Sequence, residues 1–220
     1  MAGYIDLHSH FVPGVDDGVT SDEEAVELCR GLCGLGFHHL VATPHIRDGM
    51  FNNRPAGLRT SFEAFAARVY ALDGMPEVGL ASEQHLDAVF VELMNGGDLL
   101  CYPGGHALLV EFPDAAFPLG VAEHFFQLSL RGVLPVVAHP ERYTPLFGKS
   151  GTLDDLLSRG AAAQLDLMSL TGRYGRKPRK AAERMLAEGA YAIACSDAHR
   201  PADAKQVGQA IARLHDLVGQ

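Results

Sequence analysis

The strongest constraint on the fold is a regular alternation of short apolar runs with longer stretches that have the periodicity of amphipathic helices. The predicted strands are the apolar runs at 4–7, 39–43, 77–82, 107–110, 134–138, 163–167 and 191–195. The predicted helices lie at 22–35, 60–72, 86–94, 121–130, 153–158, 181–188 and 202–218. Strands that alternate with helices form a parallel sheet, which is either open or closed into a barrel. The sequence therefore predicts an α/β fold of seven strand–helix units.

Histidine or acidic residues follow six of the seven predicted strands, at the point where each strand ends. In chain order these residues are His8 with His10, His45, Glu83, Glu111, His139, and Asp197 with His199. An open doubly wound sheet gathers its ligands at one switch point, whereas a barrel brings the C-terminal ends of all its strands to one face. The placement favours a TIM-like (β/α)7 barrel. On the remaining strand, Asp166 either supports this site or is structural.

The residue types at the strand ends are those that bind divalent metal ions. His8 and His10 lie two apart at the end of a strand, so their imidazoles point the same way and can bind one ion. Asp16 and Asp17 follow a Pro-Gly turn and add carboxylate oxygens. A single histidine at such a position is often an ordinary core or surface group. Repetition of the pattern at six strand ends favours a shared metal site instead.

Composition limits the class of protein. The 220 residues, 47% of them hydrophobic, fit one domain with a full core, so we expect a single catalytic domain over 1–220. The net charge of -9 argues against a nucleic-acid partner. No signal-peptide pattern and no apolar window of about 18 residues occurs, so we expect no membrane insertion and a cytoplasmic location. The four cysteines are too scattered for a disulfide framework and are expected to be reduced.

Several other hydrolytic mechanisms lack their motifs in this chain. A cysteine phosphatase needs a Cys-x5-Arg loop, but the residues six positions after the four cysteines are Leu35, His39, Ala107 and Pro201. Gly-x4-Gly-Lys-Ser/Thr and Gly-x-Ser-x-Gly are absent as well, which argues against nucleotide-driven chemistry and a serine hydrolase.

The ordered motifs DLHSH, VDDG, ATPH, LLVEF, HPER and SDAH resemble those of the polymerase and histidinol phosphatase (PHP) superfamily. More narrowly, they resemble its bacterial protein-tyrosine phosphatases of the CpsB, CapC and YwqE type, over nearly the whole chain. The resemblance implies a distorted seven-stranded barrel of the PHP type that binds three divalent ions, expected to be manganese, with iron or zinc also compatible. It implies hydrolysis of phosphotyrosine on a protein, namely the tail of a tyrosine autokinase that controls capsule or exopolysaccharide synthesis. A homo-oligomer is compatible with this resemblance.

Carried over by motif, the implied metal ligands are His8, His10, Asp17, His45, Glu83, Glu111, His139, Asp197 and His199. The expected reaction is direct attack on phosphorus by a metal-bound hydroxide, with Asp197, His199 and Arg142 as catalytic residues. Arg142 lies three residues after His139 and is predicted to bind the phosphoryl group, because a guanidinium matches it in a bidentate manner. The alternative for Arg142 is a salt bridge with Glu141.

The chain also departs from the family pattern. Relatives tend to carry an arginine a few residues after the final Asp-x-His, whereas here Arg200 follows directly and either replaces it in substrate binding or faces solvent. The segment 46–50 differs as well. The basic run at 173–180 would attract an acidic phosphorylated tail or is a solvated loop and helix start.

Two other functions stay open from the sequence. The nearer one is a small-molecule phosphatase of the same superfamily, of the histidinol-phosphate phosphatase type. The other is a catalytically silent metal-binding module that docks on a kinase. A nuclease-like phosphodiesterase is disfavoured by the negative net charge and by the lack of a basic, aromatic track.

Overall fold

Strands and helices alternate along the residues that the computed structural model describes, 3–149 and 151–219. The outermost ends of the predicted domain lie outside these residues. The strands are β1 (Tyr4–Ser9), β2 (Phe37–Ala42), β3 (His45–Ile46), β4 (Glu77–Leu80), β5 (Glu83–His85), β6 (Ala107–Glu111), β7 (Leu134–Ala138), β8 (Ala162–Asp166) and β9 (Ile193–Cys195). The α-helices are α1 (Asp22–Gly34), α2 (Pro55–Val69), α3 (Ala88–Gly96), α4 (Val121–Leu130), α5 (Gly151–Ser158), α6 (Arg176–Ala187) and α7 (Asp203–Val218). Three short 3-10 helices are η1 (Pro140–Arg142), η2 (Thr144–Leu146) and η3 (Leu167–Thr171).

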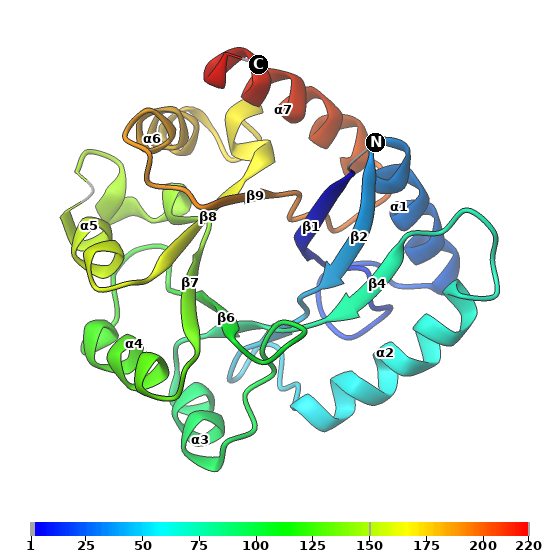
Figure 1. Cartoon of the computed structure of the whole chain (residues 1–220), viewed down its shortest axis with the longest axis horizontal. Helices are drawn as coiled ribbons and strands as arrows, with labels where there is room; N and C mark the ends of the chain where they lie inside the picture. Colours follow the sequence, from blue (N-terminus) through cyan, green and yellow to red (C-terminus); the bar gives the residue numbers. More distant parts are fainter. Residues whose placement is uncertain (1–2, 150, 220) are drawn as a thin grey trace.

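The strands form a ring with the α-helices around its outside (Figure 1). Two parallel sheets make up this ring, in the orders β1-β2-β4 and β3-β5-β6-β7-β8-β9. They meet on one side where β2 leads into β3 and β4 into β5, and the amide of Glu83 donates to the carbonyl of Thr43 at 3.2 Å. On the other side, β1 lies beside the segment after β9, and the amide of Asp197 donates to the carbonyl of His8 at 2.8 Å. The predicted barrel is confirmed, in a distorted form.

The distortion comes from two predicted strands that are each followed by a further short strand, which pairs in the other sheet. The run at 39–43 overlaps β2, and β3 begins only after Thr43 and Pro44, because proline has no amide hydrogen to donate to a strand ladder. The run at 77–82 contains β4, and β5 begins just after it; the amide of Ser82 between the two strands donates to the carbonyl of Leu100 at 3.0 Å. His45 opens β3 and Glu83 opens β5.

The helix boundaries depart from the predictions at two places that matter for the site. The helix expected at 60–72 begins at Pro55, where a proline is favourable in the first turn. The helix expected at 181–188 begins at Arg176, so its predicted start is wrong and most of the basic run at 173–180 is helical rather than loop.

Apolar side chains fill the barrel and leave its C-terminal end polar. The interior cluster comprises Val41, Ala81, Tyr102, Leu109, Val136 and Ala138. The Tyr102 hydroxyl donates to the carbonyl of Leu7 at 2.8 Å, which satisfies a buried polar group inside the barrel.

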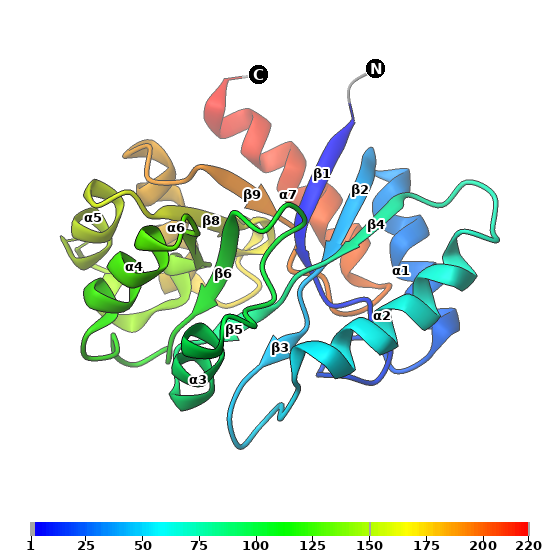
Figure 2. The same cartoon turned by 60° about the horizontal axis from the view of Figure 1, so that its bottom comes forward.

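β1 begins and α7 ends on one side of the barrel, and the segment after β3 projects from the opposite side (Figure 2). Within the described residues, no helix has the length and apolar character needed to cross a bilayer.

Candidate metal centre

The structure brings the nine predicted ligands together at the C-terminal ends of the strands. Their donor atoms form three overlapping groups, each with all its atoms within 4.8 Å of one another. The groups are His8, His10, Glu83 and Asp197; His10, Asp17, His45 and His199; and His45, Glu83 and Glu111. The ninth residue, His139, is outside the groups, but its Nε2 lies 2.8 Å from Oε1 of Glu83. Each group therefore has a donor set suited to one divalent ion.

Burial and mutual charge set the electrostatics of this cluster. Burial lowers the pKa of His8, but the carboxylates of Glu83 and Asp197 outweigh it and raise the pKa to about 9. The nearest atoms are Nε2 of His8 and Oδ1 of Asp197, at 3.1 Å. Burial also raises the pKa of Glu83, but His8 and His45 outweigh it and hold that pKa well below its usual range. Carboxylates that stay ionised in a buried site are good ligands for a cation.

Unsatisfied buried atoms provide a test of whether these residues fit metal ions. Nδ1 of His45, Nδ1 of His139 and Oδ1 of Asp197 are buried and make no hydrogen bond of acceptable geometry among the described residues, although charged groups lie 3.1 Å from the first and the last of them. Such atoms are costly unless something pairs with them, and all three are of the kinds that ligate divalent ions. The residues present therefore fit a metal centre.

Polar residues behind the cluster fix the orientation of two histidine rings. Nδ1 of His8 lies 2.6 Å from Oε1 of Gln164 on β8, and Nδ1 of His10 lies 2.8 Å from Oδ2 of Asp16. Each contact leaves the Nε2 atom of the ring facing the cluster, as is common for histidines that bind metals. Asp16 thus supports His10, whereas Asp17 is 54% exposed and lies 3.5 Å from Nε2 of His199. Nothing in the sequence singled out Gln164.

Two residues of the cluster have unusual backbone conformations. His139 has φ 29° and Asp197 has φ 48°, and they are the non-glycine residues with positive φ among the described positions. This region of φ is unfavourable for residues with a β-carbon, and it commonly occurs at functional sites. His139 directly follows β7, and Asp197 lies two residues after the end of β9.

Arg142 lies on η1 at the edge of the cluster. Its Nη1 atom is 2.6 Å from Oδ2 of Asp197 and 3.5 Å from Oδ2 of Asp166, and its guanidinium lies 4.6 Å from the centre of the Tyr174 ring. The predicted alternative, a salt bridge with Glu141, is wrong. Glu141 is buried and instead accepts hydrogen bonds from Ser169 and Tyr191, each at 2.9 Å.

A cavity of about 430 Å³ opens over the cluster, and Arg142 also lines it. Its floor includes His45, Glu83, Glu111, Asp197 and His199. Its rim consists of Arg47, Met50 and Phe51 after β3, and of Pro113, Asp114 and Ala115 after β6. The Phe51 ring stacks on the His45 ring, with centroids 5.0 Å apart and an interplanar angle of 9°. The arrangement offers several cationic and metal-binding groups to one bound anion.

Comparison with known proteins identifies the family. A family model described as "Capsular polysaccharide synthesis, CpsB/CapC" matches residues 4–218. The chain belongs to the CpsB/CapC family. The tyrosine-protein phosphatase YwqE of Bacillus subtilis is 29% identical over 202 residues, which cover 89% of this chain and 77% of that protein. The tyrosine-protein phosphatase CpsB of Streptococcus pneumoniae is 27% identical over 222 residues, which cover 96% and 90%.

The fold of this CpsB/CapC family member also matches solved structures. A match described as crystal structures of YwqE and CpsB, "unique metal-dependent tyrosine phosphatases", has a TM-score of 0.90 at 28% identity and covers 99% of this chain and 88% of that one. The resemblance inferred from the motifs is confirmed.

Arg200 differs in its surroundings from Arg142. Its Nη1 atom donates to the carbonyl oxygens of Gly18 and His199, and its side chain does not line the 430 Å³ cavity. A role of Arg200 in substrate binding stays a prediction.

Proposed function

We propose that this member of the CpsB/CapC family is a metal-dependent protein-tyrosine phosphatase. The observation that carries the proposal is the convergence of three overlapping donor groups and Arg142 on one cavity. The similarity to YwqE and CpsB, which are described as tyrosine-protein phosphatases, supports the choice of substrate class.

We assign the nine predicted ligands to three divalent ions, with manganese as the expected metal and iron or zinc as compatible ones. The three donor groups support this number, because each contains at least three donor atoms within 4.8 Å of one another. Mixed nitrogen and oxygen donors suit all three metals. When bound, such ions neutralise phosphate oxygens and lower the pKa of water toward neutrality.

The residues of the chain itself bind and orient the phosphoryl group. Arg142 binds the phosphoryl group through its fork of N–H donors, and Asp197 holds that fork in place through the contact at 2.6 Å. The phenolate of tyrosine leaves with a conjugate pKa of about 10, so it needs less help from a general acid than a serine alkoxide would.

The finer parts of the proposal concern the biological setting. The substrate is a phosphorylated tyrosine autokinase tail in capsule or exopolysaccharide synthesis, in the cytoplasm, and residues 1–220 act as one catalytic domain. The family description, capsular polysaccharide synthesis, supports this setting.

Metal-dependent turnover tests the proposal. Chelated protein refilled with manganese is assayed on p-nitrophenyl phosphate, a phosphotyrosine peptide and histidinol phosphate. We expect manganese to restore hydrolysis of the peptide, and His139→Ala to lower it by about a hundredfold or more. His38→Ala, at an exposed histidine outside the cluster, is the matched control and should retain full activity.

Other outcomes would change the proposal in specific ways. Turnover of histidinol phosphate with an inert peptide would support the small-molecule phosphatase. Metal-loaded protein that hydrolyses none of the three phosphoesters would support the silent docking module.

A further inference from the structure

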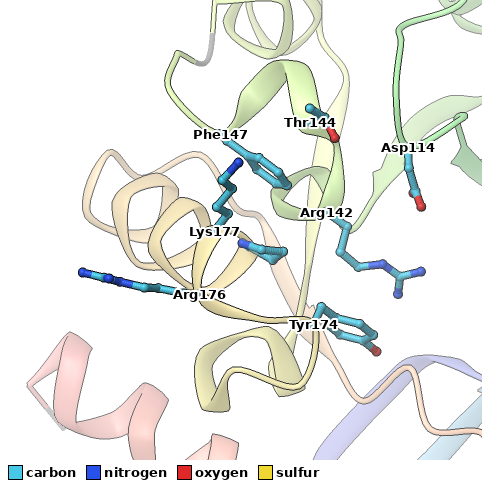
Figure 3. Close-up of a pocket in the computed structure, with 8 residues that line it drawn as sticks. Asp114, Arg142, Thr144, Phe147, Tyr174, Arg176 and Lys177 are labelled. Atoms are coloured by element: carbon cyan, nitrogen blue, oxygen red, sulfur yellow. The ribbon is translucent and has the colours of Figure 1, made fainter.

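A second cavity, of about 450 Å³, lies beside the candidate metal centre (Figure 3). Arg142 and Asp114 line both cavities, so the two adjoin. Consecutive residues of an extended peptide are about 3.5 Å apart along the chain. A phosphotyrosine held at Arg142 would therefore place a residue next to it in the sequence near the second cavity.

The wall away from the metal centre is the start of α6, which is strongly basic. Arg176 and Lys177 lie in its first turn, no acidic residue does, and Gly175 provides no side-chain cap. Because the N-terminus of a helix carries partial positive charge, cations in the first turn are unfavourable. Arg179 pairs with Glu183 at 3.4 Å, but Arg176 and Lys177 pair with no acidic group of the described chain. An anion bound here would relieve this excess of positive charge.

The side chains of the cavity divide it into an apolar and a charged part. Phe147, Pro178 and Tyr174 give it apolar walls. Figure 3 shows Lys177 extending beside Phe147, whereas Arg176 points away and Asp114 lies on the opposite side near Arg142. Lys177 is therefore the cation best placed to contact an anionic ligand in this cavity. It lies away from Asp114, the acidic group that would repel such a ligand.

We propose that this cavity is a subsite for a negatively charged side chain next to the phosphotyrosine of the substrate, with Lys177 as its main cationic contact. The inference rests on the proposed function for the position of the phosphotyrosine, and it deepens that function by naming acidic peptides as the substrate class. A carboxylate and the phosphate of a second modified residue share this chemistry.

Binding of short peptides tests the subsite independently of turnover. Fluorescent peptides carry a non-hydrolysable phosphonate analogue of phosphotyrosine, flanked by glutamate, by phosphotyrosine or by glutamine, and their affinities for manganese-loaded protein are measured by anisotropy. Lys177→Gln is compared with Lys180→Gln, which makes the same charge change on the same helix but outside the cavity lining.

The expected result is a preference for charged neighbours that depends on Lys177. We expect the wild type to bind the acidic peptides about two- to fivefold more tightly than the glutamine peptide, as for a partly exposed charge pair. The preference should shrink as salt rises, vanish in Lys177→Gln and persist in Lys180→Gln. With hydrolysable peptides, Lys177→Gln should raise KM for the acidic ones and leave kcat and the rate on p-nitrophenyl phosphate unchanged. The tighter of the two acidic peptides identifies carboxylate or phosphate as the preferred group.

Two outcomes would overturn the subsite. One is equal affinity of the wild type for the acidic and glutamine peptides. The other is an equal loss in Lys177→Gln and Lys180→Gln, which would assign the preference to net charge alone. Lys177-dependent binding without hydrolysis of any phosphotyrosine peptide would instead overturn the phosphatase proposal and retain the subsite.

Discussion

The Nη1 atom of Arg142 lies 2.6 Å from Oδ2 of Asp197, and the other oxygen of that carboxylate lies 3.1 Å from Nε2 of His8. One carboxylate therefore joins the histidine–acid cluster to the arginine at its edge. Burial raises the pKa of Asp197, but His8 and other cationic neighbours outweigh it and hold the pKa well below its usual range. Asp197 is thus charged at neutral pH and can bind a metal ion and Arg142 at the same time.

This shared carboxylate predicts different effects of two conservative substitutions. Arg142→Lys keeps the charge but loses the planar fork, so we expect kcat/KM on a phosphotyrosine peptide to fall by about 10²–10³ with an unchanged metal content. Asp197→Asn should lower activity and metal content together. Steady-state kinetics and elemental analysis of the same preparations measure both. Loss of metal from Arg142→Lys would contradict the separation of roles.

Metal binding is predicted to release protons from the cluster. Because the pKa of His8 is raised to about 9 by Glu83 and Asp197 against the effect of burial, its imidazole is protonated in metal-free protein at pH 7.5. A metal ion needs the neutral ring, so it must displace that proton. The apparent affinity for manganese should therefore rise with pH, by about tenfold per unit for each proton released, and level off above the pKa.

Calorimetry checks this prediction. Manganese is titrated at pH 7.5 in two buffers of different ionisation enthalpy. The apparent binding enthalpies should differ by the number of protons released multiplied by the difference between the two ionisation enthalpies. At a pH above the raised pKa the difference should become smaller. Buffer-independent enthalpies at pH 7.5 would mean that the metal-free histidines are already neutral.

The contact between Asp6 and Ser196 is predicted to stabilise the closed barrel. Asp6 on β1 is buried and accepts hydrogen bonds from the amide of Ser196 at 2.9 Å and from its hydroxyl at 2.5 Å, across the junction with the segment after β9. Asp6→Ala would leave the Ser196 amide buried without a partner and the hydroxyl with only the carbonyl of His8, at 3.2 Å, so we expect a loss of about 2–4 kcal/mol in the free energy of unfolding. Urea unfolding measures it, with the exposed Asp73→Ala as control. A loss below about 0.5 kcal/mol would show that the junction does not depend on this contact.

The sequence predicted the features that follow from local pattern. Apolar runs marked the strands, and the polar residues that end them, such as Glu111 and His139, were placed at one face because parallel strands of a barrel end together. The start of α6 was missed because its first turn is charged and lacks the apolar periodicity that begins at Ala181. The contact of Gln164 with His8 joins residues 156 positions apart, and no local pattern encodes it.

The rim of the first cavity is predicted to recognise the aromatic ring of the substrate. Met50 is 59% exposed, although it borders a cavity whose floor is charged and polar. An alkyl phosphate would not reach this rim, whereas the ring of phosphotyrosine extends outward from a phosphoryl group bound at the floor. Contact with the ring would bury part of the Met50 side chain. Burial of about one methylene group stabilises the complex by about 1 kcal/mol.

Met50→Ala should accordingly raise KM for phosphotyrosine peptides and p-nitrophenyl phosphate by about fivefold, the ratio that corresponds to about 1 kcal/mol, and leave kcat unchanged. KM for a small alkyl phosphate should not change, because that substrate makes no contact with the rim. Leu130→Ala is the matched control, since Leu130 is 65% exposed at the end of α4 and lines neither cavity. Equal effects of Met50→Ala on aryl and alkyl substrates would show that Met50 acts on the metal centre rather than on the ring. In that case the selectivity for tyrosine would have to come from the opposite rim, at Pro113 and Ala115.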